Sequence, residues 1–106
     1  DAIKAFKKAI ELNPFDADGF NNIGVAFQEK GNLEKAIEAF KKAISLNPNH
    51  FESHYNLGNS LNRQGKRDDA IKSFKKAISI NPNYFKAYNN LGNALKNQSK
   101  QYVYRV

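Results

Sequence analysis

The sequence contains no cysteine, and only three prolines interrupt its 106 residues. The absence of cysteine excludes disulfides, zinc fingers, iron–sulfur sites and thiol nucleophiles. No apolar run approaches the roughly 18 residues that a membrane-spanning helix needs, and the mean hydropathy is -0.71. A chain without cysteine is compatible with any redox environment, so the sequence leaves the compartment open.

The composition that remains is that of a folded domain. With 41% hydrophobic and 25% charged residues, the chain is neither collagen-like nor fully disordered. The formal net charge of +7 favours acidic partners but indicates no particular fold. The chain begins with Asp1 rather than Met, which predicts a piece or a processed form of a longer protein.

The chain repeats itself with a fixed period. Pro14, Pro48 and Pro82 are separated by 34 residues, and each follows an asparagine. The six residues 5–10 recur as residues 39–44 and, with one change, as residues 73–78. A period of about 20 to 50 residues is typical of a solenoid, in which similar units stack in a row.

Each period contains two helical patterns. Phe20, Ile23, Gly24 and Phe27 have the i, i+3, i+4, i+7 spacing of an amphipathic helix. A turn follows at residues 31–32, and a second apolar stripe then runs from residue 36 to residue 44. Small residues on both stripes allow the two helix backbones to approach closely. We therefore predict a helical hairpin that buries its apolar face only by stacking on neighbours.

These residues resemble the tetratricopeptide repeat (TPR) family. In residues 17–50 the matching residues are Phe20, Ile23, Gly24, Phe27, Gly31, Ala36, Phe40, Ala43 and Pro48. In residues 51–84 they are His54, Leu57, Gly58, Leu61, Gly65, Ala70, Phe74, Ala77 and Pro82. Residues 1–16 are similar to the second helix of a preceding repeat, and residues 85–98 to the first helix of a following one. The resemblance implies an all-α, right-handed α-solenoid with units 1–16, 17–50, 51–84 and 85–106.

The sequence departs from the family pattern in two places. His54 occupies the position of the bulky aromatic Phe20 and is expected to be a weaker wedge. Residues 101–106 do not have the pattern of a second helix, and Ser99 replaces the turn glycine. This last segment could extend the preceding helix, lie extended, or be foreign to the fold.

The resemblance implies that the first helices line a concave groove, and asparagine is frequent on the side of these helices opposite the core stripe. A carboxamide has two donor hydrogens and an acceptor, so it can hold the N–H and C=O groups of a peptide backbone. The array resembles the repeat region of O-linked N-acetylglucosamine transferases, whose groove carries asparagine at this repeat position. We therefore expect a protein or peptide ligand, held without a cofactor. The candidate groove residues are Asn22, Asn56, Asn90, Asn21, Tyr55, Asn59, Asn89, Asn93 and Lys86. The alternative is that these asparagines are solvated surface residues.

The residues bear on three further binding modes. A clamp for a terminal carboxylate is disfavoured, because only Asn56 and Lys86 match its charged and amide groups. Exposed lysine pairs recur at residues 7–8, 41–42 and 75–76 and would attract nucleic acid, but a solvated face is the simpler interpretation. His50 and His54 are four residues apart, yet His54 occupies a packing position, so we expect no metal site.

Two expectations remain about activity and assembly. No phosphate-binding loop or nucleophile–base arrangement is present, which predicts a non-enzymatic chain. Apolar residues at both ends of the repeat array have no partner helix in the pattern, which predicts head-to-tail self-association or a fragment with missing neighbours.

Overall fold

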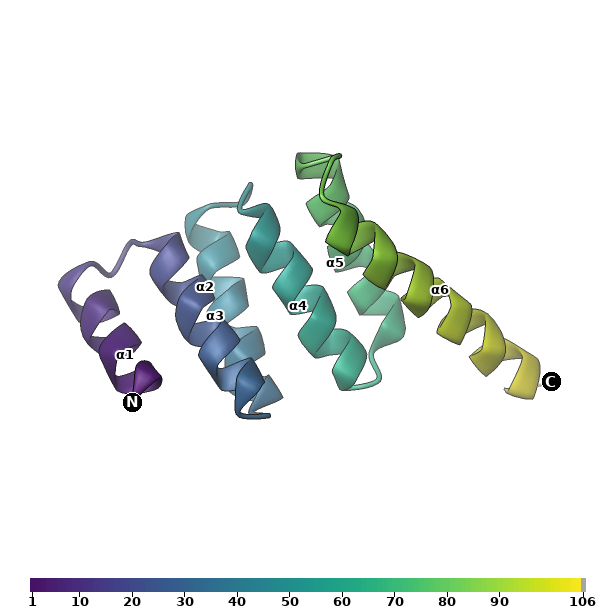
Figure 1. Cartoon of the computed structure of the whole chain (residues 1–106), viewed down its shortest axis with the longest axis horizontal. Coiled ribbons are helices and arrows are strands. Elements are labelled where there is room, and N and C mark those ends of the chain that lie inside the picture. Colours follow the sequence, from purple (N-terminus) through teal and green to yellow (C-terminus); the bar gives the residue numbers. More distant parts are fainter. Residues whose placement is uncertain (106) are drawn as a thin grey trace.

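A computed structural model describes the backbone of residues 1–105 and the side chains of residues 1–98. In this part of the chain there are six helices and no strand. The helices are α1 (Ala2–Leu12), α2 (Ala17–Glu29), α3 (Leu33–Leu46), α4 (Phe51–Arg63), α5 (Arg67–Ile80) and α6 (Phe85–Arg105). They stack as antiparallel hairpins into an elongated body of 52 × 28 × 19 Å (Figure 1). The all-α solenoid predicted from the sequence is confirmed.

Short polar side chains and glycines determine where the helices begin and end. The carboxylate of Asp16 accepts a hydrogen bond from the backbone N–H of Asp18 at the start of α2, which satisfies one of the free donors of the first turn. Gly31 and Gly65 follow α2 and α4 with φ angles of 80° and 84°, a left-handed conformation that glycine adopts without strain. These two glycines turn the chain back on itself between the helices of each hairpin.

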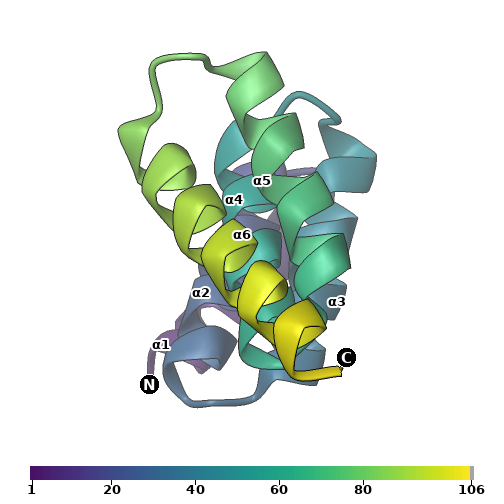
Figure 2. The ribbon, with the colours of Figure 1, turned by 90° about the vertical axis from the view of Figure 1, so that its right-hand side faces the viewer.

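The six helices form two layers. The inner helices, α2, α4 and α6, contact one another in sequence; α2 and α4 also pack against the outer helices before and after them, and α6 packs against α5. The outer helices, α1, α3 and α5, have no Cα atoms within 8 Å of one another in the described chain. The inner helices therefore lie closer together than the outer ones along the row of helices (Figures 1 and 2).

Each hairpin is held together by a phenylalanine that lies on a glycine. Phe40 and Phe74 are fully buried, at 0% exposure. A Cβ atom added to Gly24 would lie 2.5 Å from Cε1 of the Phe40 ring, and Gly58 has the same relation to Phe74 at 2.6 Å. Fully buried alanines surround both rings. The small residues of the repeat therefore give the aromatic ring direct access to the facing backbone.

The two ends of the array are less buried than its middle. None of the residues of α1 is buried. On α6, Tyr88 and Leu95 are 48% and 40% exposed, and the space next to the Cα of Gly92 is open. Of the three alternatives for the last segment, the structure has the extension of the preceding helix, because α6 continues without a break to Arg105. Val106 lies outside the described residues.

Candidate functional site

The predicted groove residues lie on the inner helices but differ in their accessibility. Asn22, Lys86, Asn89 and Asn93 are exposed. Tyr55, Asn56, Asn59 and Asn90 are half-buried, and Asn21 is buried at 8% exposure. The nine residues therefore do not form one uniform surface. Those on α4 and α6 that face a preceding inner helix are partly used to join neighbouring repeats.

Asn21 is a junction between α2 and α4 rather than a free groove residue. Its Oδ1 accepts hydrogen bonds from Asn56 Nδ2 and from Ser53 Oγ, both at 3.0 Å. A buried acceptor with two donors is well satisfied. Asn56 thus donates one carboxamide hydrogen to the neighbouring repeat. Its Oδ1 accepts no hydrogen bond within the described residues.

Asn90 joins α6 to α4 in the same manner. Its Nδ2 donates to Asn59 Oδ1 at 2.6 Å and to Tyr55 Oη at 3.1 Å. Both donor hydrogens of this carboxamide are then occupied, and its acceptor oxygen has no partner in the described part of the chain. The Tyr55 ring also packs edge-on against Tyr84, with 5.1 Å between the ring centroids. Tyr55 is therefore committed to internal packing and is not a free stacking surface.

A polar hollow of about 320 Å³ opens on the inner face between α2, α4 and α6. It is lined by Gln28, Asn59, Asn62, Arg63, Asn90 and Asn93. Asn59, Asn90 and Asn93 are among the candidate groove residues. Gln28, Asn62 and Arg63 belong to the same side of the inner helices, opposite the core stripe, and Gln28 and Asn62 occupy the same repeat position 34 residues apart.

Gln28 connects the first repeat to the second. Its Nε2 donates to the Ser60 hydroxyl at 2.8 Å and to the Asn56 carbonyl at 3.2 Å. Arg63 Nη1 in turn donates to the Gln28 carbonyl at 3.3 Å. These contacts bridge the last turns of α2 and α4, and they fix the walls of the hollow.

The family model of the TPR repeat matches residues 1–31, 26–65 and 58–99, which together cover most of the chain. The chain belongs to the tetratricopeptide repeat family. The TPR repeats support a protein–protein interaction module. A search of curated protein sequences returned no match.

Several solved TPR structures are similar to this chain. A crystal structure of MamA has 31% identity and a TM-score of 0.85, and the match covers 92% of this chain and 53% of that one. The chain therefore spans about half the length of MamA. The O-GlcNAc transferase of Thermobaculum terrenum has 29% identity and a TM-score of 0.84, with coverage of 88% and 18%. The first TPR of Spaghetti (RPAP3), solved with an HSP90 peptide, has 20% identity and a TM-score of 0.89, with coverage of 92% and 77%.

Both histidines make hydrogen-bond contacts within this TPR array. The Nε2 atom of His50 lies 2.6 Å from Asp18 Oδ1. Because a carboxylate only accepts, Nε2 bears a proton. Nδ1 lies 2.8 Å from Ser53 Oγ and 3.3 Å from the Ser53 backbone nitrogen. His54 Nε2 instead donates to the Pro48 carbonyl at 2.9 Å. Within the described residues, no group of three or more His, Cys, Asp or Glu side chains has an arrangement that could hold a metal ion.

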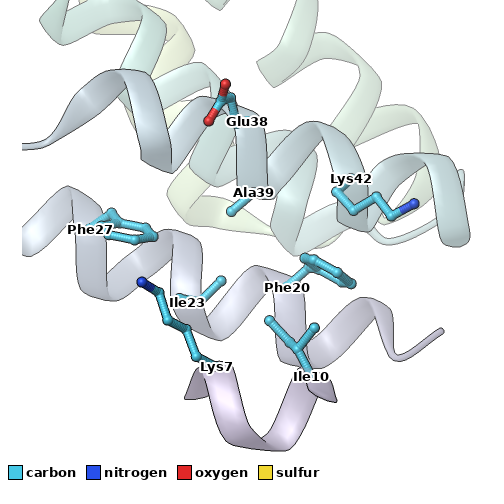
Figure 3. A pocket seen from close by; sticks show the side chains of 8 residues that line it. All are labelled: Lys7, Ile10, Phe20, Ile23, Phe27, Glu38, Ala39 and Lys42. Carbon is cyan, nitrogen blue, oxygen red and sulfur yellow. The ribbon is translucent and has the colours of Figure 1, made fainter. Parts of the chain in front are cut away.

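The outer face of the array carries the lysine pairs and one apolar groove. All six lysines of the pairs at residues 7–8, 41–42 and 75–76 are exposed on the outer helices. The groove, of about 310 Å³, lies between α1 and α3 (Figure 3). Its lining consists of Lys7, Ile10, Phe20, Ile23, Phe27, Glu38, Ala39 and Lys42.

No helix of the described chain is long and apolar enough to cross a membrane.

Proposed function

We propose that this TPR module binds an extended peptide segment along the inner helices and holds its backbone through asparagine side chains. The observation that supports the proposal is the polar hollow between α2, α4 and α6, whose lining includes the recurring Asn90 together with Asn59, Asn62 and Asn93. A peptide backbone needs partners for its N–H and C=O groups, and the amide-rich lining offers both.

The internal hydrogen bonds refine the role of each asparagine. Asn56 and Asn90 donate to the preceding inner helix, so each offers mainly its Oδ1 oxygen to a ligand. Asn22 is exposed, and its carboxamide is accessible in the described residues. We infer that Asn56 and Asn90 accept peptide N–H groups, whereas Asn22 can both donate and accept.

One solved structure among those compared is consistent with this proposal. The RPAP3 TPR binds a peptide, SRMEEVD from HSP90, and the proposed ligand is likewise a peptide segment. At 20% identity, the likeness to that protein concerns the fold alone. The groups that would form a carboxylate clamp are incomplete in this sequence, so we place the ligand backbone, not its terminus, at the centre of recognition.

The test is fluorescence anisotropy with a labelled pool of extended peptides, at low and raised salt. We expect the triple variant Asn22→Ala, Asn56→Ala, Asn90→Ala to lose peptide capture. Loss of the internal bonds of Asn56 and Asn90 costs about 0.5–1.5 kcal/mol each, so circular dichroism must show intact helices at the assay temperature. Asn49→Ala with Asn83→Ala, which removes exposed amides from the turns, is the control. Unchanged affinity in the folded triple variant would contradict the asparagine ladder.

A second candidate function is head-to-tail self-association, favoured by the complementary ends of the array. Phe6, Ala9 and Ile10 of α1 are identical to residues 40, 43 and 44 of α3, which packs on α2. The corresponding face of α6 is open above Gly92. We propose that α1 of a second copy covers this face. Light scattering over a concentration series tests the proposal, which requires a mass that rises with concentration.

A further inference from the structure

We propose that the polar hollow takes an anionic side chain of the bound peptide, a carboxylate or a phosphate, through Arg63. This inference rests on the proposed peptide function and names the residue class that the groove selects. The lining contains five amide side chains and one guanidinium, and none of its members is acidic. A site that has amide donors and a cation but no carboxylate binds an oxyanion more strongly than it binds a neutral amide group of a ligand.

The guanidinium of Arg63 is held in place but not neutralised. Its Nη1 donates to the Gln28 carbonyl at 3.3 Å, near the last residue of α2. A guanidinium has five N–H donors in one plane, so this bond leaves most of them available. Arg63 is exposed, and within the described residues it has no ion pair within 4.0 Å.

The amides of the hollow are fixed with their donors and acceptors in a defined arrangement. Asn90 donates to Asn59 Oδ1 at 2.6 Å, so the Asn59 oxygen is occupied and does not face a ligand as a free acceptor. Asn93 is exposed on α6 and lines the same hollow, where its Nδ2 can donate to an oxyanion. Asn62 Oδ1 and Asn90 Oδ1 have no partner among the described residues, so the hollow also keeps acceptors for peptide N–H groups. The preference for a negatively charged group therefore rests on the cation of Arg63.

The charged residues that follow the lining of the hollow on α6 and α2 have opposite signs. Lys96 follows on α6, one turn after Asn93, whereas Glu29 follows Gln28 on α2, and both are exposed. Glu29 forms no ion pair with Arg63 within 4.0 Å, and it does not line the hollow. Arg63 therefore remains the charged group that a ligand in the hollow meets directly.

The experiment uses four labelled pools of short peptides, randomised over uncharged residues, with Glu, Gln, phosphoserine or Lys at the centre. Anisotropy is measured for the wild-type chain and for Arg63→Gln, Arg63→Lys and Arg63→Glu. A charge-assisted hydrogen bond predicts that the wild type binds the Glu pool about tenfold more tightly than the Gln pool. Arg63→Gln should abolish this difference, and Arg63→Lys should retain part of it because the charge remains. Arg63→Glu should reverse it in favour of the Lys pool.

Lys66→Gln is the matched control, because it removes the same charge from an exposed turn residue outside the hollow. A preference for phosphoserine over Glu would support the same site with phosphate as its ligand. If the wild type binds peptides but binds the Glu and Gln pools equally, only the proposed role of Arg63 is overturned. Absence of binding by all four pools would overturn the peptide function itself, so the two failures are distinguishable.

Discussion

At the scale of single residues, His54 is the side chain whose charge responds most clearly to its surroundings. Partial burial lowers the pKa of His54 below its ordinary 6.5, because a charged ring loses hydration. The bond to the Pro48 carbonyl acts in the opposite direction, and the nearby charges of Lys76 and His50 lower the pKa further. His54 therefore prefers to be neutral in the folded chain, as suits a residue at a position filled by Phe20 in the repeat before.

This lowered pKa predicts a loss of stability in acid. Between the folded pKa and 6.5, the unfolded state binds more protons than the folded state. The contribution of His54 to stability is thus complete above pH 6.5. It decreases as the pH falls through the lower pKa that His54 has in the folded chain. We expect the free energy of unfolding to fall more between about pH 7.5 and about pH 5.5 in the wild type than in His54→Phe. Urea titrations at both pH values test this, and parallel changes in the two proteins would contradict it.

The asparagines illustrate how far single residues could be predicted from the sequence. The 34-residue period placed Asn22, Asn56 and Asn90 at the same repeat position, and the structure has all three on inner helices. Their hydrogen bonds differ, because a partner is present for Asn56 and Asn90 but not for Asn22. The 34-residue period defines the position of each asparagine in its repeat. The hydrogen-bond partner of Asn56 or Asn90 depends on which inner helix precedes its own helix. Asn21 is buried because α4, the inner helix that follows α2, supplies Ser53 and Asn56 as its hydrogen-bond donors.

At the scale of helices, the contact between an inner glycine and an outer phenylalanine decides how closely a hairpin packs. The sequence predicted this close approach from small residues on the apolar stripes. It did not predict the bond from His50, which begins α4, to Asp18 in α2. Histidine is an unusual residue at a helix start, and no local pattern indicates a partner 32 residues earlier. Helix positions thus follow from periodicity, whereas polar contacts between repeats require the three-dimensional arrangement.

This packing predicts that alanine is destabilising at Gly24 although alanine favours helices. A Cβ at Gly24 would lie 2.5 Å from the Phe40 ring, which is fully buried. Overpacking costs about 1–3 kcal/mol, and the gain in helix propensity is about 1 kcal/mol. We expect Gly24→Ala to lower the free energy of unfolding by about 1 kcal/mol. In a urea series, Gly24→Ala with Phe40→Leu should recover part of the loss, and a stabilised Gly24→Ala single variant would contradict this packing.

At the scale of the whole molecule, the array ends where its stacking pattern could continue. Phe40 and Phe74 are fully buried on a glycine, whereas their counterpart Phe6 is half-exposed. Gly92, the counterpart of Gly24 and Gly58, has no neighbouring atom within 4 Å of an added Cβ. Docking Phe6 of a second copy on Gly92 would repeat a contact that the chain already makes twice. Such head-to-tail contacts continue from copy to copy or close into a ring.

The Gly92→Ala variant separates the stability of one chain from its association. In an isolated chain the added Cβ meets open space, so we expect a gain of about 1 kcal/mol in stability from helix propensity. In a head-to-tail complex the same Cβ would collide with the docked ring, as at Gly24, and association should weaken. The prediction is a higher melting temperature at low concentration together with a smaller mass at high concentration. Asn93→Ala raises helix propensity at an exposed neighbour and should leave association unchanged. Equal association of the wild type and Gly92→Ala would contradict docking on this face.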